Sequence, residues 1–98
     1  MAKAYWVVSY RAIHDVEAFA RYAAAAPAAV QEQGGRFLVR GMAAKAYEAG
    51  ILQRVVLIEF DSLAQALAAH DAPAYQVALK ELAGDAVERD LRIVEGLA

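Results

Sequence analysis

The stretch from Gln53 to Phe60, Gln-Arg-Val-Val-Leu-Ile-Glu-Phe, constrains the fold of this chain more than any other. Its β-branched, aliphatic and aromatic residues occupy nearly every position on both sides of an extended backbone. This pattern is typical of a central strand that is covered on both faces. Helices of the same chain can cover one face. A chain of 98 residues has little sequence left for the other face, so we expect a second copy of the chain to cover it.

The composition narrows the class of protein. A chain of 98 residues predicts one domain over residues 1–98, and a chain of that size buries about 60 to 70% of the surface that it exposes when unfolded. Hydrophobic residues make up 60% of the sequence, with many alanines among them. That proportion is high for a small soluble domain and again indicates a surface hidden by association.

Several classes of function are excluded by what the chain lacks. The absence of cysteine excludes disulfides, thiolate metal sites and cysteine nucleophiles, and it fits a reducing cytoplasm. A formal net charge of -2 and a pI near 5.6 give no basic field for a nucleic-acid backbone. The two histidines lack a paired-ligand spacing, so we expect no metal and no cofactor. No apolar run approaches the about 20 residues that cross a bilayer, and we expect a cytoplasmic protein.

Residue patterns predict four strands and two helical regions. The predicted elements, in chain order, are a strand at 4–11, a helix from residue 15 to the glycines at 34–35, a strand at 36–41 prolonged through 42–48, the strand at 53–60, a helix that follows residue 62, a second helical segment at 73–84, a polar connection at 85–90 and a strand at 91–95.

Four polar or proline residues predict how the helices begin and where one is interrupted. Asp15 and Ser62 can accept hydrogen bonds from amides of the following turn, and Gln65 makes a capping box with Ser62. Pro27 removes the helical hydrogen bond to the carbonyl of Ala23, so we expect a kink or a restart there.

The order strand, helix, two strands, helix, strand predicts a ferredoxin-like α+β fold. Right-handed crossovers place the first and third strands in the middle of an antiparallel four-stranded sheet, with both helices on one side. These two strands are the ones that are apolar on both faces.

Alternation along the strands, without bulges, divides their side chains into two sets. The set without charges is expected beneath the helices: Trp6, Val8, Tyr10, Phe37, Val39, Val56, Ile58, Phe60, Leu91 and Ile93. The other set is mixed: Tyr5, Val7, Ser9, Arg36, Leu38, Arg40, Val55, Leu57, Glu59, Arg92 and Val94. Such a mixture is typical of a subunit interface or a lined cavity. RNA-binding domains share this element order, but Val55 and Leu57 replace the aromatic residues that would stack on bases.

Several segments together resemble one family. They are Tyr5-Trp6-Val7-Val8, the helical run at 17–23, the run Gly-Gly-Arg-Phe-Leu-Val-Arg-Gly at 34–41, residues 55–63, Pro73-Ala74-Tyr75-Gln76 and the closing residues 90–96. Over almost the whole chain the sequence is similar to the domain of unknown function 1330 family. The resemblance implies membership of the dimeric α/β-barrel superfamily, in which two ferredoxin-like sheets pack face to face. That superfamily includes cofactor-independent monooxygenases, small isomerases and lyases, and members without known activity.

Five residues are candidates for ligand binding: Tyr22, Arg40, Glu59, His70 and Tyr75. His70 next to Asp71 could act as a general base while Tyr75 positions a substrate, although neighbouring helical residues point about 100° apart. Arg40 and Glu59 could pair across the sheet as a structural ion pair or bind a polar ligand. Tyr22 and Tyr75 could reach a cavity between helices and sheet, or pack in the core with satisfied hydroxyls.

The sequence favours a small cytoplasmic homodimer that associates through its sheet face and binds a small, partly apolar molecule. Two alternatives stay open. One is a cofactor-independent enzyme, monooxygenase- or isomerase-like, and the other is a purely structural dimer. No nucleophile motif or phosphate-binding glycine loop points to a particular reaction.

Overall fold

Four antiparallel strands form one sheet in the order β2-β3-β1-β4. The computed structural model describes residues 2–98. Its elements are β1 (Ala4–Ile13), α1 (Val16–Glu32), β2 (Arg36–Met42), β3 (Arg54–Phe60), α2 (Leu63–Asp71), α3 (Pro73–Leu79), the 3-10 helix η1 (Lys80–Leu82) and β4 (Val87–Glu95).

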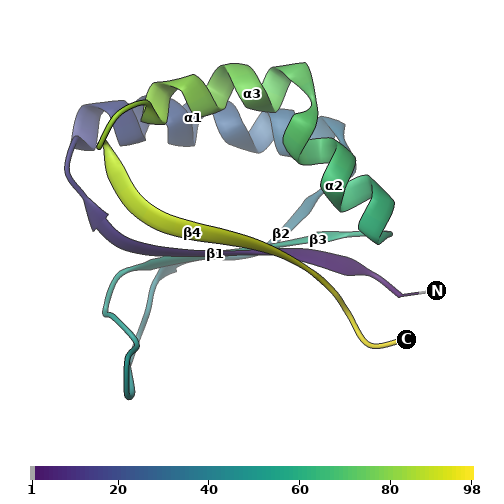
Figure 1. The fold of residues 1–98 in the computed structure, drawn as a ribbon, viewed down its shortest axis with the longest axis horizontal. Coiled ribbons are helices and arrows are strands. Elements are labelled where there is room, and N and C mark those ends of the chain that lie inside the picture. The colour runs from purple at the N-terminus through teal and green to yellow at the C-terminus, as the bar shows by residue number, and fades with distance from the viewer. Residues whose placement is uncertain (1) are drawn as a thin grey trace.

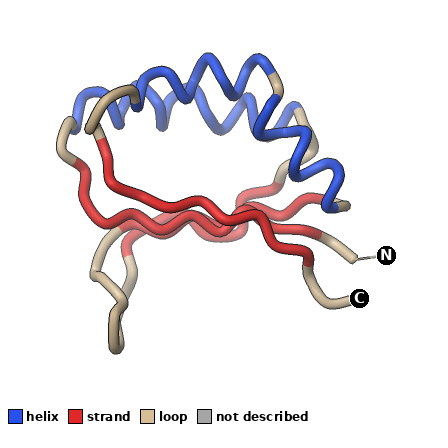
Figure 2. The backbone as a smooth tube through the Cα atoms, in the orientation of Figure 1, coloured by secondary structure: helices blue, strands red, loops and turns tan. Residues whose placement is uncertain are grey.

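The helices form a second layer on one face of the sheet, as Figure 1 shows. The predicted ferredoxin-like arrangement is confirmed, and the two doubly apolar strands β1 and β3 lie in the middle of the sheet. Figure 2 shows that none of the helices within residues 2–98 lies on the other face, which we call the open face, and that the loop between β2 and β3 extends away from the sheet on that side. The open face carries Val7, Leu57 and Val94, which pair in register or lie diagonally across β1, β3 and β4.

The core lies between the two layers and is built around Trp6. Its ring packs against Phe60 and Tyr75 at centroid distances of 5.4 and 4.9 Å, and its indole Nε1 donates to the carbonyl of Ala66 at 2.9 Å. The helices turn mainly alanines toward the sheet: Ala18, Ala26, Ala29, Ala66, Ala69 and Ala78 are all buried. Small side chains let the helix backbones approach the sheet closely, so large aromatic residues of the strands fill the space between the layers.

The predicted helix starts are confirmed. Asp15 Oδ1 accepts from the amide of Ala18 at 3.0 Å, and Ser62 Oγ accepts from the amide of Gln65 at 3.1 Å. The Gln65 side chain does not close the capping box, because it donates to the carbonyl of Gln33 instead. The expected restart at Pro27 is wrong, since α1 continues through it without a break. Within residues 2–98 no helix combines the length and the apolarity needed to cross a membrane.

A β-bulge in β2 overturns the predicted faces of two residues. The register shifts between Phe37 and Val39, so that Val39 pairs with Leu57 and Arg40 pairs with Val56. Val39 therefore lies on the open face, where it is 46% exposed, and Arg40 turns to the helix side. The strict alternation that we assumed fails here because a bulge inserts one extra residue on one strand.

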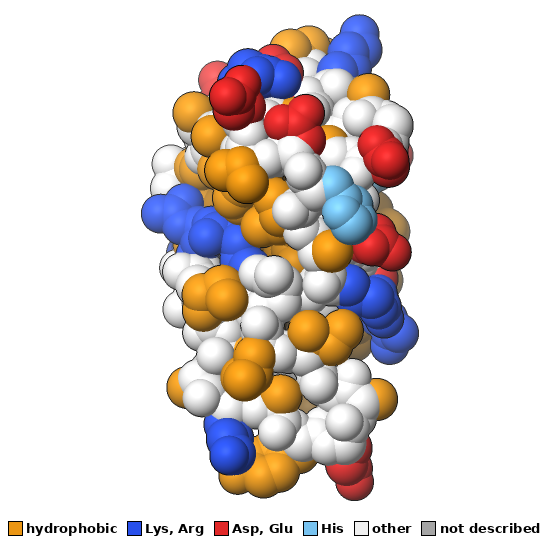
Figure 3. Space-filling view, turned by 90° about the vertical axis from the view of Figure 1, so that its left-hand side faces the viewer, with side chains coloured by type: hydrophobic (Ala, Val, Ile, Leu, Met, Phe, Trp, Pro, Cys, Tyr) orange, Lys and Arg blue, Asp and Glu red, His pale blue; other side chains and the backbone are white. Residues whose placement is uncertain are grey.

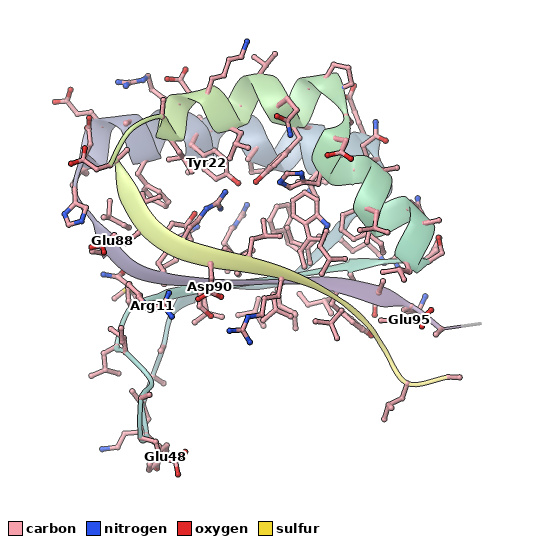
Figure 4. The ribbon with its side chains drawn as sticks, in the orientation of Figure 1. Arg11, Tyr22, Glu48, Glu88, Asp90 and Glu95 are labelled. Atoms are coloured by element: carbon pink, nitrogen blue, oxygen red, sulfur yellow. The ribbon has the colours of Figure 1, made fainter. Side chains whose placement is uncertain are left out.

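Two predicted boundaries are also wrong. Residues 43–53 do not prolong β2 but form the loop that extends from the open face, with Glu48 near its tip (Figure 4). The last strand begins at Val87 rather than at 91, so most of the expected polar connection belongs to β4. The polar run was misassigned because one side of an edge strand faces solvent and tolerates charge.

Gly35 gives a direct test of the packing between α1 and β3. A Cβ atom there would lie 2.5 Å from Cγ1 of Val30 and 2.9 Å from Cζ of Phe60, whereas one at Gly41 meets nothing within 4 Å. We expect Gly35→Ala to lower the free energy of unfolding by about 1–3 kcal/mol through overpacking, and Gly41→Ala, the matched control, to change it far less. Urea denaturation followed by circular dichroism measures both. Equal effects of the two substitutions would contradict this account.

Candidate ligand-binding site

A cavity opens between the helix layer and the sheet, and we call it the helix–sheet cavity. Its volume is about 40 Å³. Apolar residues supply most of its wall, with two tyrosines and three arginines among them. It is lined by Trp6, Val8, Tyr10, Phe19, Tyr22, Ala23, Ala26, Pro27, Val30, Phe37, Arg40, Arg54, Val56, Ile58 and Arg89. Apolar walls with a few convergent polar groups are typical of a small-molecule site.

The three arginines come from three strands and lie toward one end of the sheet. Arg54 is the first residue of β3, Arg40 pairs with Val56 in the adjacent row, and Arg89 pairs with Tyr10 across β1 and β4. Each guanidinium packs on an aromatic ring: Arg40 lies 4.9 Å from the centroid of Phe37, and Arg54 lies 5.2 Å from that of Phe19. At the end of the molecule where β1 leads into α1, Figure 3 shows basic side chains beside hydrophobic ones.

Arg89 is at the centre of a cluster of tyrosine hydroxyls. Its Nη1 donates to the hydroxyls of Tyr10 and Tyr22, each at 3.3 Å, and its Nη2 donates to that of Tyr75 at 3.2 Å. The hydroxyls of Tyr22 and Tyr75 are 2.7 Å apart and are hydrogen-bonded to each other. Tyr22 extends from α1 toward the sheet (Figure 4), so the cluster joins α1 and α3 to β1 and β4.

Burial keeps the tyrosines neutral. It raises the pKa of the Tyr22 phenol well above its ordinary value, with a further contribution from Tyr75, and the nearby Arg89 only partly offsets this. Burial likewise raises the pKa of Tyr10. For Arg89, burial acts to lower the pKa, but the interactions with Tyr22 and Tyr75 outweigh it and the pKa is raised. In the cluster a protonated guanidinium therefore meets the neutral phenols of Tyr10 and Tyr22.

The structure brings three of the five predicted residues together. Tyr22 and Arg40 line the helix–sheet cavity, and Tyr75 lies directly behind Tyr22 through their shared hydrogen bond. Sequence reasoning had left open whether these tyrosines were core or site. Their rings are buried in the core, and their hydroxyls meet the charged group of Arg89.

Glu59 and His70 lie elsewhere. Glu59 is on the open face, where Oε1 accepts from Arg36 Nε and Oε2 accepts from the hydroxyl of Tyr5, both at 3.1 Å. The predicted pairing of Arg40 with Glu59 is wrong, because the bulge places Arg40 on the opposite face. His70 packs near the ring of Tyr75 at 5.4 Å, its Nδ1 is 3.3 Å from Oδ1 of Asp71, and it does not line the cavity.

Sequence reasoning missed Arg54 and Arg89. Alternation through Val56 and Ile58 places Arg54 on the helix side, and alternation back from Leu91 places Arg89 there too. That signal was present in the sequence. It was overlooked because arginine at the end of an apolar strand resembles a residue leaving the core for solvent.

A second hollow, of about 440 Å³, lies on the open face between the sheet and the β2–β3 loop. Its walls include Val7 and Val55 of the sheet and Tyr47 and Ile51 of the loop. It also contains the ion pair between Arg11 and Asp90, at 2.8 Å. Arg92 lies 3.9 Å from the same Asp90, whereas Lys45, also in the wall, forms no ion pair with any described residue.

Fold and site together define a class, a ferredoxin-like α+β protein with an arginine-lined cavity between its layers. The chain belongs to the family described as domain of unknown function (DUF1330), whose model matches residues 3–97. The family resemblance seen in the sequence is thereby confirmed. No similar sequence is found among proteins with curated functions.

Solved structures share the fold at low sequence identity. A protein of unknown function from Rhodopseudomonas palustris superposes with a TM-score of 0.75 at 18% identity, covering 99% of this chain and 84% of that one. The methylated form of that protein superposes with a TM-score of 0.73 at 17% sequence identity, covering 99% of this chain and 82% of that one. A putative antibiotic biosynthesis monooxygenase from Nitrosomonas europaea superposes with a TM-score of 0.62 at 14% sequence identity, covering 98% of this chain and 90% of that one. At these identities the likeness concerns the fold alone.

The raised tyrosine pKa predicts a loss of stability in alkali. In the unfolded chain a tyrosine titrates near its ordinary pKa of about 10, whereas folded Tyr22 titrates higher. Its contribution to stability is therefore full below about pH 10 and is lost as the pH rises further, because the unfolded chain releases the proton first.

We expect Tyr22→Phe to weaken this alkaline dependence, and Tyr47→Phe, which removes a hydroxyl from an exposed ring, to preserve it. Urea titrations between pH 8 and pH 11 measure the change. The same alkaline slope in wild type and Tyr22→Phe would show that Tyr22 does not carry the effect.

Proposed function

We propose that this protein binds a small, partly apolar molecule in the helix–sheet cavity and acts as a homodimer through its open face. The observation that carries the binding role is the cavity itself, in which aromatic and aliphatic walls converge with the Arg89–tyrosine cluster. Arg89 is partly buried, and a guanidinium partly withdrawn from water beside apolar walls is costly to maintain. A binding role explains why this interior position is kept charged.

A cofactor-independent enzyme is the second candidate. The fold likeness to a putative monooxygenase and the close Tyr22–Tyr75 pair support it. A group that removes a proton from substrate would have to lie within hydrogen-bond reach of it. Among the described residues that line the cavity none is a carboxylate or a histidine. The raised pKa values of Tyr10 and Tyr22 keep these two phenols protonated, so binding ranks above catalysis.

The proposed binding role predicts that a small molecule stabilises the protein. It also predicts that this stabilisation is lost when a larger side chain fills the cavity. We expect at least one aromatic or short aliphatic compound from a fragment library to raise the melting temperature of the protein. Trp6, the single tryptophan, lines the cavity, so binding should also change its fluorescence.

Ala23→Leu places a larger side chain in the cavity wall and should abolish both responses. Ala24→Leu makes the same change at an exposed neighbour on α1 and should preserve them. A flat response of the wild type across a broad library would contradict the binding role. A response that survives in Ala23→Leu would place the ligand elsewhere.

The dimer proposal rests on apolar exposure around the open face. Val39 and Val94 are 46% and 48% exposed, and the β2–β3 loop adds Tyr47, Ile51 and Leu52 to the apolar surface. An exposed apolar surface of this kind is typical of a protein interface. The charged residues among them, such as the Glu59–Arg36 pair, would supply polar contacts within the interface.

We expect light scattering to give the mass of a dimer for the wild type at micromolar concentration. Leu57→Lys places a charge in the middle of the open face and should shift the protein to monomer. Leu67→Lys, at an exposed leucine of α2, should leave the dimer intact. A stable wild-type monomer, or equal effects of both substitutions with native circular dichroism spectra, would contradict association through this face.

A further inference from the structure

The arginines of this chain fall into two groups. Arg11, Arg21, Arg36 and Arg92 each lie within 4.0 Å of a carboxylate oxygen, and all four are outside the helix–sheet cavity. Arg40, Arg54 and Arg89 line the cavity. Within residues 2–98 these three are the arginines that form no ion pair. The arginines without an ion pair are therefore gathered at one site, while Lys45 and Lys80, the lysines for which no ion pair is formed within residues 2–98, lie outside it.

From this contrast we propose that the ligand is a small organic anion, a monocarboxylate or an equivalent oxyanion with an apolar body, whose charged oxygens lie among Arg40, Arg54 and Arg89. The inference rests on the proposed binding function and specifies its ligand. Arg54 and Arg89 are partly buried beside apolar walls, and there they attract negative charge more strongly than they would in water, because the local dielectric is lower.

The hydrogen atoms of the cluster lead to the same ligand chemistry. A guanidinium has five N–H donors, and Arg89 uses three of them on the hydroxyls of Tyr10, Tyr22 and Tyr75. Two donors remain. In the Tyr22–Tyr75 pair one hydroxyl donates to the other, so one phenol proton remains as well. Tyr22 lines the cavity and Tyr75 does not, and when Tyr75 donates to Tyr22 the remaining proton is free to point into the cavity.

The cavity thus offers hydrogen-bond donors without a matching set of acceptors. Such a site favours a ligand oxygen that accepts several hydrogen bonds, and a carboxylate accepts as many as four. Charge-assisted hydrogen bonds of this kind are about twice as strong as neutral ones. A neutral amide of the same shape brings two N–H donors of its own, which would face donors, so the site should discriminate against it.

The apolar walls of the cavity determine which apolar group the ligand can carry. Trp6, Phe37, Val30 and Ile58 supply apolar wall, and they suit a short aliphatic chain or one ring. A volume of about 40 Å³ accepts only part of such a molecule, so the ligand extends toward Arg40, whose side chain is exposed. This excludes large, polar or multiply charged ligands such as nucleotides.

Matched pairs of acid and amide test the proposal. We would titrate the protein at pH 7 with hexanoate and hexanamide, and with benzoate and benzamide, and follow Trp6 fluorescence and calorimetric heat. We expect the acid of at least one pair to bind ten-fold or more tightly than its amide. Raising the salt concentration should weaken binding of the acid more than binding of the amide.

Substitutions identify the charges responsible. The double variant Arg40→Gln, Arg54→Gln should lower acid affinity at least ten-fold and leave amide binding within two-fold. These two side chains make no hydrogen bond to the tyrosine cluster, so the fold should survive, as circular dichroism would verify. Arg21→Gln, at an exposed residue paired with Glu81, changes the net charge outside the cavity and should leave acid affinity within two-fold.

These experiments distinguish a failure of the anion proposal from a failure of the proposed small-molecule binding function. The anion proposal is overturned if an amide binds as tightly as its acid, or if the double variant binds the acid as tightly as Arg21→Gln does. Either result leaves the proposal of a small-molecule site standing. If neither member of any pair binds, and the broad fragment library also gives no response, both proposals are overturned.

Discussion

The partly buried guanidinium of Arg89 is the group that ties the two layers together. It comes from β4 and donates to Tyr10 of β1, Tyr22 of α1 and Tyr75 of α3. A charge withdrawn from water is costly unless hydrogen bonds replace its hydration. Three phenols do so here, and because they come from three elements they connect α1 and α3 to β1 in the middle of the sheet and to β4 at its edge.

The interior is therefore graded from one end to the other. Around Trp6, alanine-faced helices pack closely on large aromatic residues, and the single indole donor is satisfied by the carbonyl of Ala66. Toward Arg89 the same interface becomes charged while its walls remain aromatic. The tightly packed end around Trp6 stabilises the fold, and the charged end around Arg89 gives the interior a polar surface. Both functions proposed for the cavity depend on this gradient.

The two central strands also explain the open face. β1 and β3 are apolar on both sides, but the helices of one chain cover only one side. On the other side apolar residues alternate with ion pairs such as Arg36 with Glu59. The β2–β3 loop, with Tyr47 76% exposed, extends beyond this surface. Within residues 2–98 no helix covers this face, and for this reason we propose that a second copy of the chain does so.

Periodicity and capping residues were sufficient to predict the element order, the ferredoxin-like topology, the central strands and both helix starts, because these depend on neighbours within a few positions. The faces of Val39 and Arg40 were not predictable in this way, since a bulge forms through pairing with a distant strand. The same holds for the site. Tyr22 and Tyr75 were recognisable as candidates, but their meeting with Arg89, from elements 67 and 14 residues away in sequence, exists only once the helices pack on the sheet.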